Sequence, residues 1–208
     1  MIVQGSDEWL AMRCGKVTAS RVKDVIAKTK TGYSASRETY MGELIAERLT
    51  GTPAEKFQSA AMRFGTENEG AARLAYEFHT GRDVFQVPFV LHPVIANSGA
   101  SPDGLIAGDG LVEFKCPNTS THIETLLSEK VPGAYVTQIQ WQMACTERAW
   151  CDFVSFDPRL PEDMRLFVKR IERDDKAISD MESEVVKFLG ELAEKVDQLT
   201  AKFRKEAA

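Results

Sequence analysis

The sequence predicts an α/β fold with a helical N-terminal region, a central mixed β-sheet flanked by helices, and a long C-terminal helix. Three observations predict it. Apolar residues recur at helical spacing before residue 80, short β-type runs follow residue 84, and one amphipathic stripe ends the chain. With 208 residues, of which 43% are hydrophobic, the chain buries a substantial core. We therefore expect one domain spanning residues 1–208.

The N-terminal region is predicted to contain three helices. The first covers roughly residues 19–28, and a polar loop around Gly32 follows it. The second runs from Ser36 to Gly51. The third runs from about residue 66 to residue 80, with Gly81 as its C-terminal cap.

The middle of the chain is predicted to form the sheet. Short apolar runs separated by Gly, Pro, Asn and Asp indicate strands, and Gly108-Asp109-Gly110 indicates a hairpin turn. The predicted strands are Val84–Leu91, Leu105–Ala107, Leu111–Cys116, Trp150–Phe156 and Leu166–Ile171, and helices are predicted near 120–130 and over 133–146. The final helix carries its apolar stripe at Ile178, Met181, Val185, Phe188, Leu192, Val196, Leu199 and Phe203.

Bulk composition excludes several classes of protein. The net charge of −5 argues against a protein that coats nucleic acid indiscriminately, although a local basic channel remains compatible with it. No apolar run is long enough to span a membrane, and the N-terminus lacks a signal-peptide pattern, so we expect a cytoplasmic protein. The four cysteines include no C-x-x-C pair, which fits neither a zinc site, an iron–sulfur cluster nor a disulfide framework.

Asp103, Glu113 and Lys115 form the most informative pattern in the chain. Across the predicted turn at 108–110 the three positions share parity, so a regular hairpin would place their side chains on one face, with Phe114 pointing into the core. Two carboxylates suit a hard divalent cation such as Mg²⁺. The lysine would steer a water or stabilise charge on a phosphate.

A simpler alternative is a surface ion pair between Glu113 and Lys115, with Asp103 forming an Asx turn before Gly104. Two details favour the site instead. Glu113 lies inside an apolar run, where a solvated face is less expected. Pro117 then ends the strand just beyond Lys115, which places the group near a sheet end, where sites are commonly built.

Other polar residues leave alternatives open. Thr66-x-x-Glu69 matches a capping box, in which Glu69 would reach back to the Thr66 amide, and locally this role is favoured over metal binding. Gln138 and Gln140 lie on a mostly apolar predicted helix. Their amides would either line a polar site or sit on the solvated side of that helix.

Seven segments in register carry a resemblance that covers nearly the whole chain. They are Gly5–Ser20, Gly65-x-x-x-Glu69-x-x-x-Arg73, Ala100–Leu105, Leu111–Pro117, Tyr135–Gln140, Asp157–Arg159 and Ile171–Asp174. Together they resemble the phage lambda exonuclease family, also called YqaJ-type viral recombinases, of the PD-(D/E)xK nuclease superfamily. The resemblance implies a restriction-endonuclease-like core.

The resemblance also implies an activity and partners. The chain would be a Mg²⁺-dependent 5′→3′ exonuclease, with Mn²⁺ as a substitute, that releases 5′-mononucleotides from double-stranded DNA ends. It would leave 3′ single-stranded tails for recombination by strand annealing. The family further implies a homotrimeric ring, a single-strand annealing protein as partner, and a bacterial host or prophage as the source. Two rivals stay open: a site- or structure-specific endonuclease of the same fold, and a non-catalytic DNA-end-binding protein.

Residue roles follow from the resemblance position by position. Asp103, Glu113 and the carbonyl of Phe114 would bind Mg²⁺, and Glu69 would serve a second metal. Lys115 would orient or activate the attacking water beside Gln138. The residues that would contact the 5′-phosphate and the DNA end are Trp9, Arg13, Thr18, Ser20, Ser101 and Met62, the last as an apolar wedge between terminal base pairs.

Overall fold

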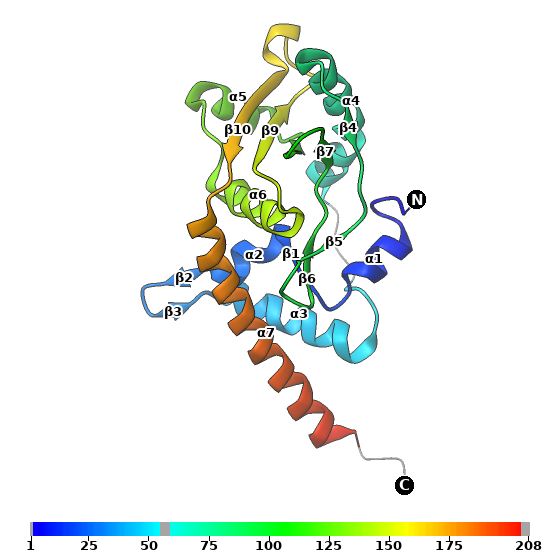
Figure 1. Cartoon of the computed structure of the whole chain (residues 1–208), viewed down its shortest axis with the longest axis vertical. Helices are drawn as coiled ribbons and strands as arrows, with labels where there is room; N and C mark the ends of the chain where they lie inside the picture. The colour runs from blue at the N-terminus through cyan, green and yellow to red at the C-terminus, as the bar shows by residue number, and fades with distance from the viewer. Residues whose placement is uncertain (1, 55–58, 205–208) are drawn as a thin grey trace.

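The fold places a sheet-containing layer above a helical layer along the long axis of the molecule (Figure 1). This computed structural model describes residues 2–54 and 59–204. The long C-terminal helix, α7 (Asp175–Phe203), starts at the sheet and crosses the helical layer diagonally (Figure 1). The predicted α/β class and the long final helix are confirmed.

The central sheet has five strands in the order β10-β9-β8-β7-β4. Their bounds are β4 (Val84–Phe85), β7 (Gly104–Ile106), β8 (Gly110–Lys115), β9 (Trp150–Phe156) and β10 (Leu166–Glu172). The β8–β9 pair is parallel and the other pairs are antiparallel, so the sheet is mixed, as predicted. β7 and β8 form the predicted hairpin.

Alternation along β8 sends side chains to two different helices. Val112 and Phe114 pack in the core formed with α4 (Ala60–Thr80). Leu111 packs on the opposite face against α6 (Gly133–Thr146). Glu113 shares the parity of Leu111, so it faces α6 while Phe114 points into the core under α4.

A second core holds the helical layer together. It joins α2 (Ala19–Ile26), α3 (Ala35–Thr50) and α7 to Trp141 of α6. A small sheet, β1 (Val17–Thr18), β6 (Ser98–Ala100) and β5 (Val90–Leu91), borders it, and α5 (Thr119–Ser128) and a short 3₁₀ turn (Glu162–Met164) complete the chain. None of the described helices is both long and apolar enough to span a membrane.

The predicted apolar stripe of α7 is buried only over part of its length. Ile178 through Leu192 contribute their stripe positions to the core, and Val196 is partly buried. Leu199 and Phe203 are 37% and 70% exposed, so the stripe prediction was wrong for the last turn of the helix. The core of the helical layer does not extend that far along α7.

Several short elements were not predicted, among them α1 (Asp7–Arg13) and a hairpin near residue 30. Helix α1 is capped by Ser6, whose hydroxyl accepts a hydrogen bond from the Trp9 amide. The segment predicted as a polar loop around Gly32 is a hairpin of β2 (Lys28–Thr29) and β3 (Gly32–Tyr33). Glu184 of α7 accepts hydrogen bonds from Lys28 and Tyr33, which fixes this hairpin from a distant part of the chain.

The start of α4 corrects a prediction about Glu69. Ser59 is the N-cap and accepts a hydrogen bond from the Met62 amide, so the helix begins well before Thr66. Thr66 is an interior residue whose hydroxyl donates to the Met62 carbonyl. The capping-box interpretation is therefore wrong, and Glu69 is free of that role. At the other end Gly81 adopts the left-handed conformation (φ 67°) as the predicted cap.

Gly104 has a packing reason to be glycine. A Cβ atom there would come within 2.1 Å of Val84 Cγ1, because β4 passes close to β7 at this point. The residue that follows Asp103 is thus constrained by volume, and any side chain would push the edge strand away from the hairpin.

Candidate active site

Asp103 and Glu113 face each other at the end of the β7–β8 hairpin that lies away from its turn. The ladder pairs Gly104 with Val112, so the next pair outward is Asp103 with Glu113. Where the ladder ends, Asp103 Oδ2 accepts a 2.7 Å hydrogen bond from the Phe114 amide. The hairpin thus brings the two carboxylates together, as parity predicted.

Glu113 is buried, with 1% of its surface exposed, and its carboxylate receives three side-chain donors. Lys115 Nζ and Gln138 Nε2 both donate to Oε1, the amide at 2.5 Å. Gln142 Nε2 donates to Oε2 at 2.6 Å. Glu113 and Lys115 do form an ion pair, but it lies inside the protein and not on a solvated surface.

The charged side chains of this site shift one another's pKa values. Burial, together with the neighbouring Glu113 carboxylate, raises the pKa of Asp103 well above its usual value. Burial alone would lower the pKa of Lys115, but the carboxylates of Glu113 and Asp103 outweigh it and raise that pKa. Lys115 is therefore a cation at neutral pH, while the two crowded carboxylates favour additional positive charge.

A cleft of roughly 500 Å³ opens at this end of the sheet. Its lining brings α4 over the end of β8 and includes Met62, Glu69, Asp103, Phe114, Lys115 and Tyr135. Glu69 is half-buried there, and burial and the charge of Glu113 raise its pKa although Arg73 opposes the shift. The structure thus places Glu69 with the hairpin acids, which local sequence reasoning had not favoured.

The residues of the cleft fit a hard divalent cation. Asp103 and Glu69 of the lining and Glu113, which is buried beside it, offer carboxylate oxygens, and Phe114 adds a backbone carbonyl, the donor types that Mg²⁺ prefers. Among the described residues, no three acidic, histidine or cysteine side chains are already spaced to hold a metal ion. Lys115 instead neutralises Glu113 in this structure.

A second polar group surrounds Ser101, two residues before Asp103. Its hydroxyl accepts hydrogen bonds from Arg13 Nη1 at 2.9 Å and from Trp9 Nε1 at 3.0 Å. The Arg13 guanidinium also lies 4.0 Å from the centre of the Trp9 ring. Because the Ser101 oxygen accepts two hydrogen bonds, its own proton is free to be donated.

Arg13 carries a positive charge and stands outside the ion pairs that the described residues form, and Glu47 acts on it at longer range. Burial lowers the pKa of Arg13 to about 10, so it remains a cation at neutral pH. A partly buried guanidinium with hydroxyl and aromatic neighbours suits an anionic ligand.

Thr18 is linked to the segment of Ser101 through the small sheet, and Ser20 follows it on α2. β1 runs parallel to β6 with Thr18 paired to Gly99, two residues before Ser101. Thr18 is buried as the N-cap of α2, and Ser20 is exposed on its first turn. The Arg13–Trp9–Ser101 contacts are direct, whereas Ser20 lies on α2 beyond the end of β1 and contacts none of these three side chains through a hydrogen bond among the described residues.

Two contacts of the site were not predicted from the sequence. Gln142 holds Glu113 from within the core, and Tyr135 lies 5.3 Å from Lys115 Nζ by its ring centre. Gln142 is four residues after Gln138 and so lies on the same side of α6, a spacing that could have revealed it.

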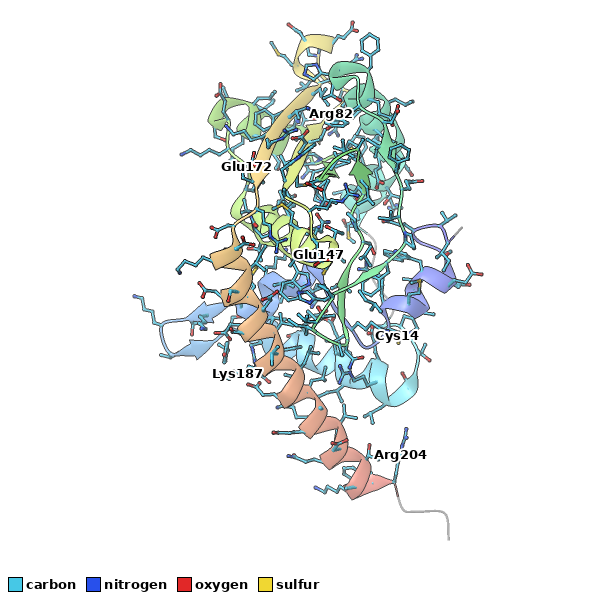
Figure 2. All side chains as sticks on the ribbon, in the orientation of Figure 1. Cys14, Arg82, Glu147, Glu172, Lys187 and Arg204 are labelled. Atoms are coloured by element: carbon cyan, nitrogen blue, oxygen red, sulfur yellow. The ribbon has the colours of Figure 1, made fainter. Side chains whose placement is uncertain are left out.

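Gln140 does not belong to the site. Its Nε2 donates to the Glu172 carbonyl at 2.8 Å, and its Oε1 accepts from the Asp174 amide at 2.9 Å. Figure 2 labels Glu172 where β10 leads into α7. Gln140 therefore anchors the start of the C-terminal helix.

Comparisons with known proteins agree with this geometry. The sequence pattern of the YqaJ-like viral recombinase domain matches residues 8–149. Two crystal structures of LHK-Exo, an alkaline exonuclease from Laribacter hongkongensis, are 53% identical in sequence, with a TM-score of 0.91 over 97% of this chain and 100% of that one. One of them is a complex with dAMP.

A more distant structure shares the fold. A phage-related exonuclease from Haemophilus somnus 129PT is 18% identical, with a TM-score of 0.69 over 90% of this chain and 96% of that one. No curated protein matches the chain.

Proposed function

Because the chain belongs to the YqaJ-like viral recombinase domain family, we propose that it is a Mg²⁺-dependent exonuclease that digests one strand of double-stranded DNA in the 5′→3′ direction. The 53% identical LHK-Exo is an alkaline exonuclease, which supports a nuclease activity for this chain. The products would be 5′-mononucleotides and a duplex with 3′ single-stranded tails.

One observation carries the chemistry: Asp103 and Glu113 lie across the β7–β8 hairpin from each other, and Asp103 lines an open cleft together with Lys115, the cation that pairs with Glu113. Asp103, Glu113, the Phe114 carbonyl and Glu69 would hold the metal. When bound, Mg²⁺, or Mn²⁺ in its place, would stabilise charge on the attacking and leaving oxygens of a phosphodiester.

Lys115 and Gln138 would act directly on the reacting groups. Both now donate to the same oxygen of Glu113, so their donors converge on one point beside the cleft. A protonated Lys115 would position the attacking water and stabilise negative charge on the scissile phosphate, and Gln138 would fix the direction of its ammonium group. The ring centre of Tyr135 lies 5.3 Å from Lys115 Nζ at the cleft.

The neighbouring cationic group would select the end of the strand. Ser101 and Asp103 are two residues apart, so their Cα atoms lie at most about 7 Å from each other. Arg13 would pair with a terminal 5′-phosphate while Ser101 donates its free proton to it, and Ser20 and the first turn of α2 would add donors. This adjacency supports 5′→3′ digestion.

Met62 supports a role in separating the strands. It is 53% exposed on α4 and lines the cleft near Glu69. An unbranched apolar side chain in this position would insert between the terminal base pairs and direct one strand toward the carboxylates.

We further propose a homotrimeric ring, a single-strand annealing protein as partner, and a cytoplasmic location.

A single digestion experiment tests the proposal. Linear duplex labelled at the 5′ or the 3′ end is incubated with Mg²⁺, and the products are separated by size. We expect immediate release of 5′-labelled mononucleotide and late loss of the 3′ label. Early release of the 3′ label would refute the polarity, rapid cutting of covalently closed plasmid would favour an endonuclease, and binding without cleavage would favour an end-binding protein.

A further inference from the structure

The Glu113 carboxylate is held from two sides by two amides of one helix. Gln138 and Gln142 lie four residues apart on α6, and each donates its Nε2 to a different oxygen of Glu113, at 2.5 Å and 2.6 Å. We propose that Gln142 is a positioning residue that fixes the orientation in which Glu113 binds the divalent cation. This inference rests on the proposed metal-dependent function.

The two oxygens of Glu113 have different surroundings. Oε1 receives Lys115, whose side chain is 24% exposed, and the half-buried Gln138. Oε2 receives Gln142, which is fully buried. Lys115 lines the cleft, so open space adjoins a donor to Oε1, whereas Gln142 is enclosed in the core. The geometry therefore makes Oε1 the exchangeable side and Oε2 the fixed one.

Gln142 occupies a position where an apolar residue would be expected. The α6 residues from Ile139 to Cys145 are all buried, and Ile139 and Met143 pack in the core beneath the sheet. The Oε1 atom of Gln142 is buried and has no hydrogen-bond partner among the described residues. An unpartnered buried carbonyl costs stability, so an amide here is disfavoured by packing alone.

The contact with Glu113 explains why an amide is present and how it is oriented. The reverse orientation would direct the carbonyl oxygen of Gln142 at the Glu113 carboxylate, which would repel it. The Nε2 donor is thus committed to Oε2. A hydrogen-bonded partner of this kind raises the precision and affinity of a metal-binding carboxylate.

Gln140 provides a matched structural control on the same helix. It is buried to a similar degree, with 5% exposed, but both its polar atoms bond the backbone at the start of α7. Its removal would weaken the docking of α7 without touching Glu113. The pair Gln142→Leu and Gln140→Leu therefore separates metal positioning from general stability.

The test measures metal binding without DNA. Mn²⁺ is titrated into the wild type, Gln142→Leu and Gln140→Leu, free Mn²⁺ is followed by electron paramagnetic resonance, and thermal unfolding is recorded for each protein in chelator. We expect Gln142→Leu to weaken Mn²⁺ binding about tenfold or more. Gln140→Leu should lower the unfolding temperature and leave Mn²⁺ affinity within about twofold of the wild type.

The outcomes test the positioning role of Gln142 separately from the proposed nuclease function. Wild-type Mn²⁺ affinity in Gln142→Leu, while the wild type binds metal and cuts DNA, would overturn the positioning role and leave the nuclease proposal intact. A wild type that neither binds Mn²⁺ nor cuts DNA would overturn both. If Gln142→Leu does not fold, Gln142→Asn withdraws the amide by one methylene and is judged by the same affinity criterion.

Discussion

Asp103 stands across the β7–β8 hairpin from Glu113, and its carboxylate takes the Phe114 amide where the strand ladder ends. The acid that crowds Glu113 also completes the backbone pairing of the hairpin. The hairpin therefore holds two carboxylates close together, and in the described part of the chain Lys115 forms the ion pair with Glu113. The repulsion between the two carboxylates opposes folding, whereas the proposed metal binding requires both of them.

Asp103→Asn is expected to abolish hydrolysis and stabilise the metal-free protein. The amide keeps an oxygen to accept the Phe114 N–H but loses the charge that Glu113 opposes. Because the folded-state pKa of Asp103 is raised above 3.8, its ionisation opposes folding as pH rises through and beyond that value. The stabilisation should be absent below pH 3.8 and present at pH 7.

Thermal unfolding in chelator at both pH values, with nuclease assays in Mg²⁺, checks this prediction. Asp109→Asn, in the exposed hairpin turn, serves as the control and should change neither quantity. A lower unfolding temperature for Asp103→Asn at pH 7 would contradict the electrostatic account.

Arg13→Gln is expected to remove the preference for a 5′-phosphate. Losing charge-assisted hydrogen bonds to a phosphate should weaken use of 5′-phosphorylated ends roughly 10- to 100-fold, with little effect on 5′-hydroxyl ends. Steady-state digestion of matched duplexes with the two ends measures the ratio. Arg170→Gln, which removes an arginine paired with Asp152, is the control. Equal losses on both ends would show that Arg13 does not contact the phosphate.

Met62→Ala is expected to slow digestion of fully paired ends more than of frayed ends. The side chain is half exposed, so its loss should cost the fold little, while a wedge would be missing from the cleft. Rates on blunt duplex and on duplex with a few unpaired 5′ nucleotides give the comparison. Leu74→Ala, at a 68% exposed position on the same helix, should leave both rates unchanged. The same slowing on both substrates would argue against strand separation.

Asp157→Asn is expected to destabilise the protein at neutral pH by about 1–2 kcal/mol, a figure discounted because Arg159 is partly exposed. Burial opposes ionisation, but hydrogen bonds from Arg159 and Thr119 outweigh it and lower the pKa of Asp157 to about 2. Its contribution is therefore present above pH 3.8 and lost as pH falls toward 2. Urea unfolding of both proteins at pH 7 and near pH 3 measures the difference, which should shrink in acid.

Asp180→Asn is the matched control for that experiment. Asp180 is 72% exposed and pairs with Lys176 one helical turn away, so its removal should be nearly neutral. A difference for Asp157→Asn that persists unchanged in acid would mean that packing, and not charge, is responsible.

The long elements and the hairpin acids were predictable because local signals agreed with the fold. The helix at 133–146 and the strand at 150–156 have the predicted bounds, and the Gly108–Gly110 turn with period-two alternation placed Asp103 opposite Glu113. Short elements were not predictable in this way. β1 and β6 have two and three residues and are held by a pairing that joins distant segments of the chain.

Glu69 and Gln142 show how local patterns mislead at a site. Thr66-x-x-Glu69 resembles a helix start, but the helix continues back to Ser59, and nothing within the motif reveals this. The sequence alone makes Gln140 a candidate for a polar site together with Gln138, although residues two apart on a helix face different directions. Helical spacing puts Gln142 on the same side of α6 as Gln138, and the structure adds that this side faces Glu113.

Two separate sets of side-chain contacts hold α6 in place. Gln138 and Gln142 point to Glu113, while Gln140 between them ties the backbone at Glu172 and Asp174. The docking of the C-terminal helix and the holding of Glu113 therefore use different side chains of one helix, so either set of contacts can be lost while the other remains.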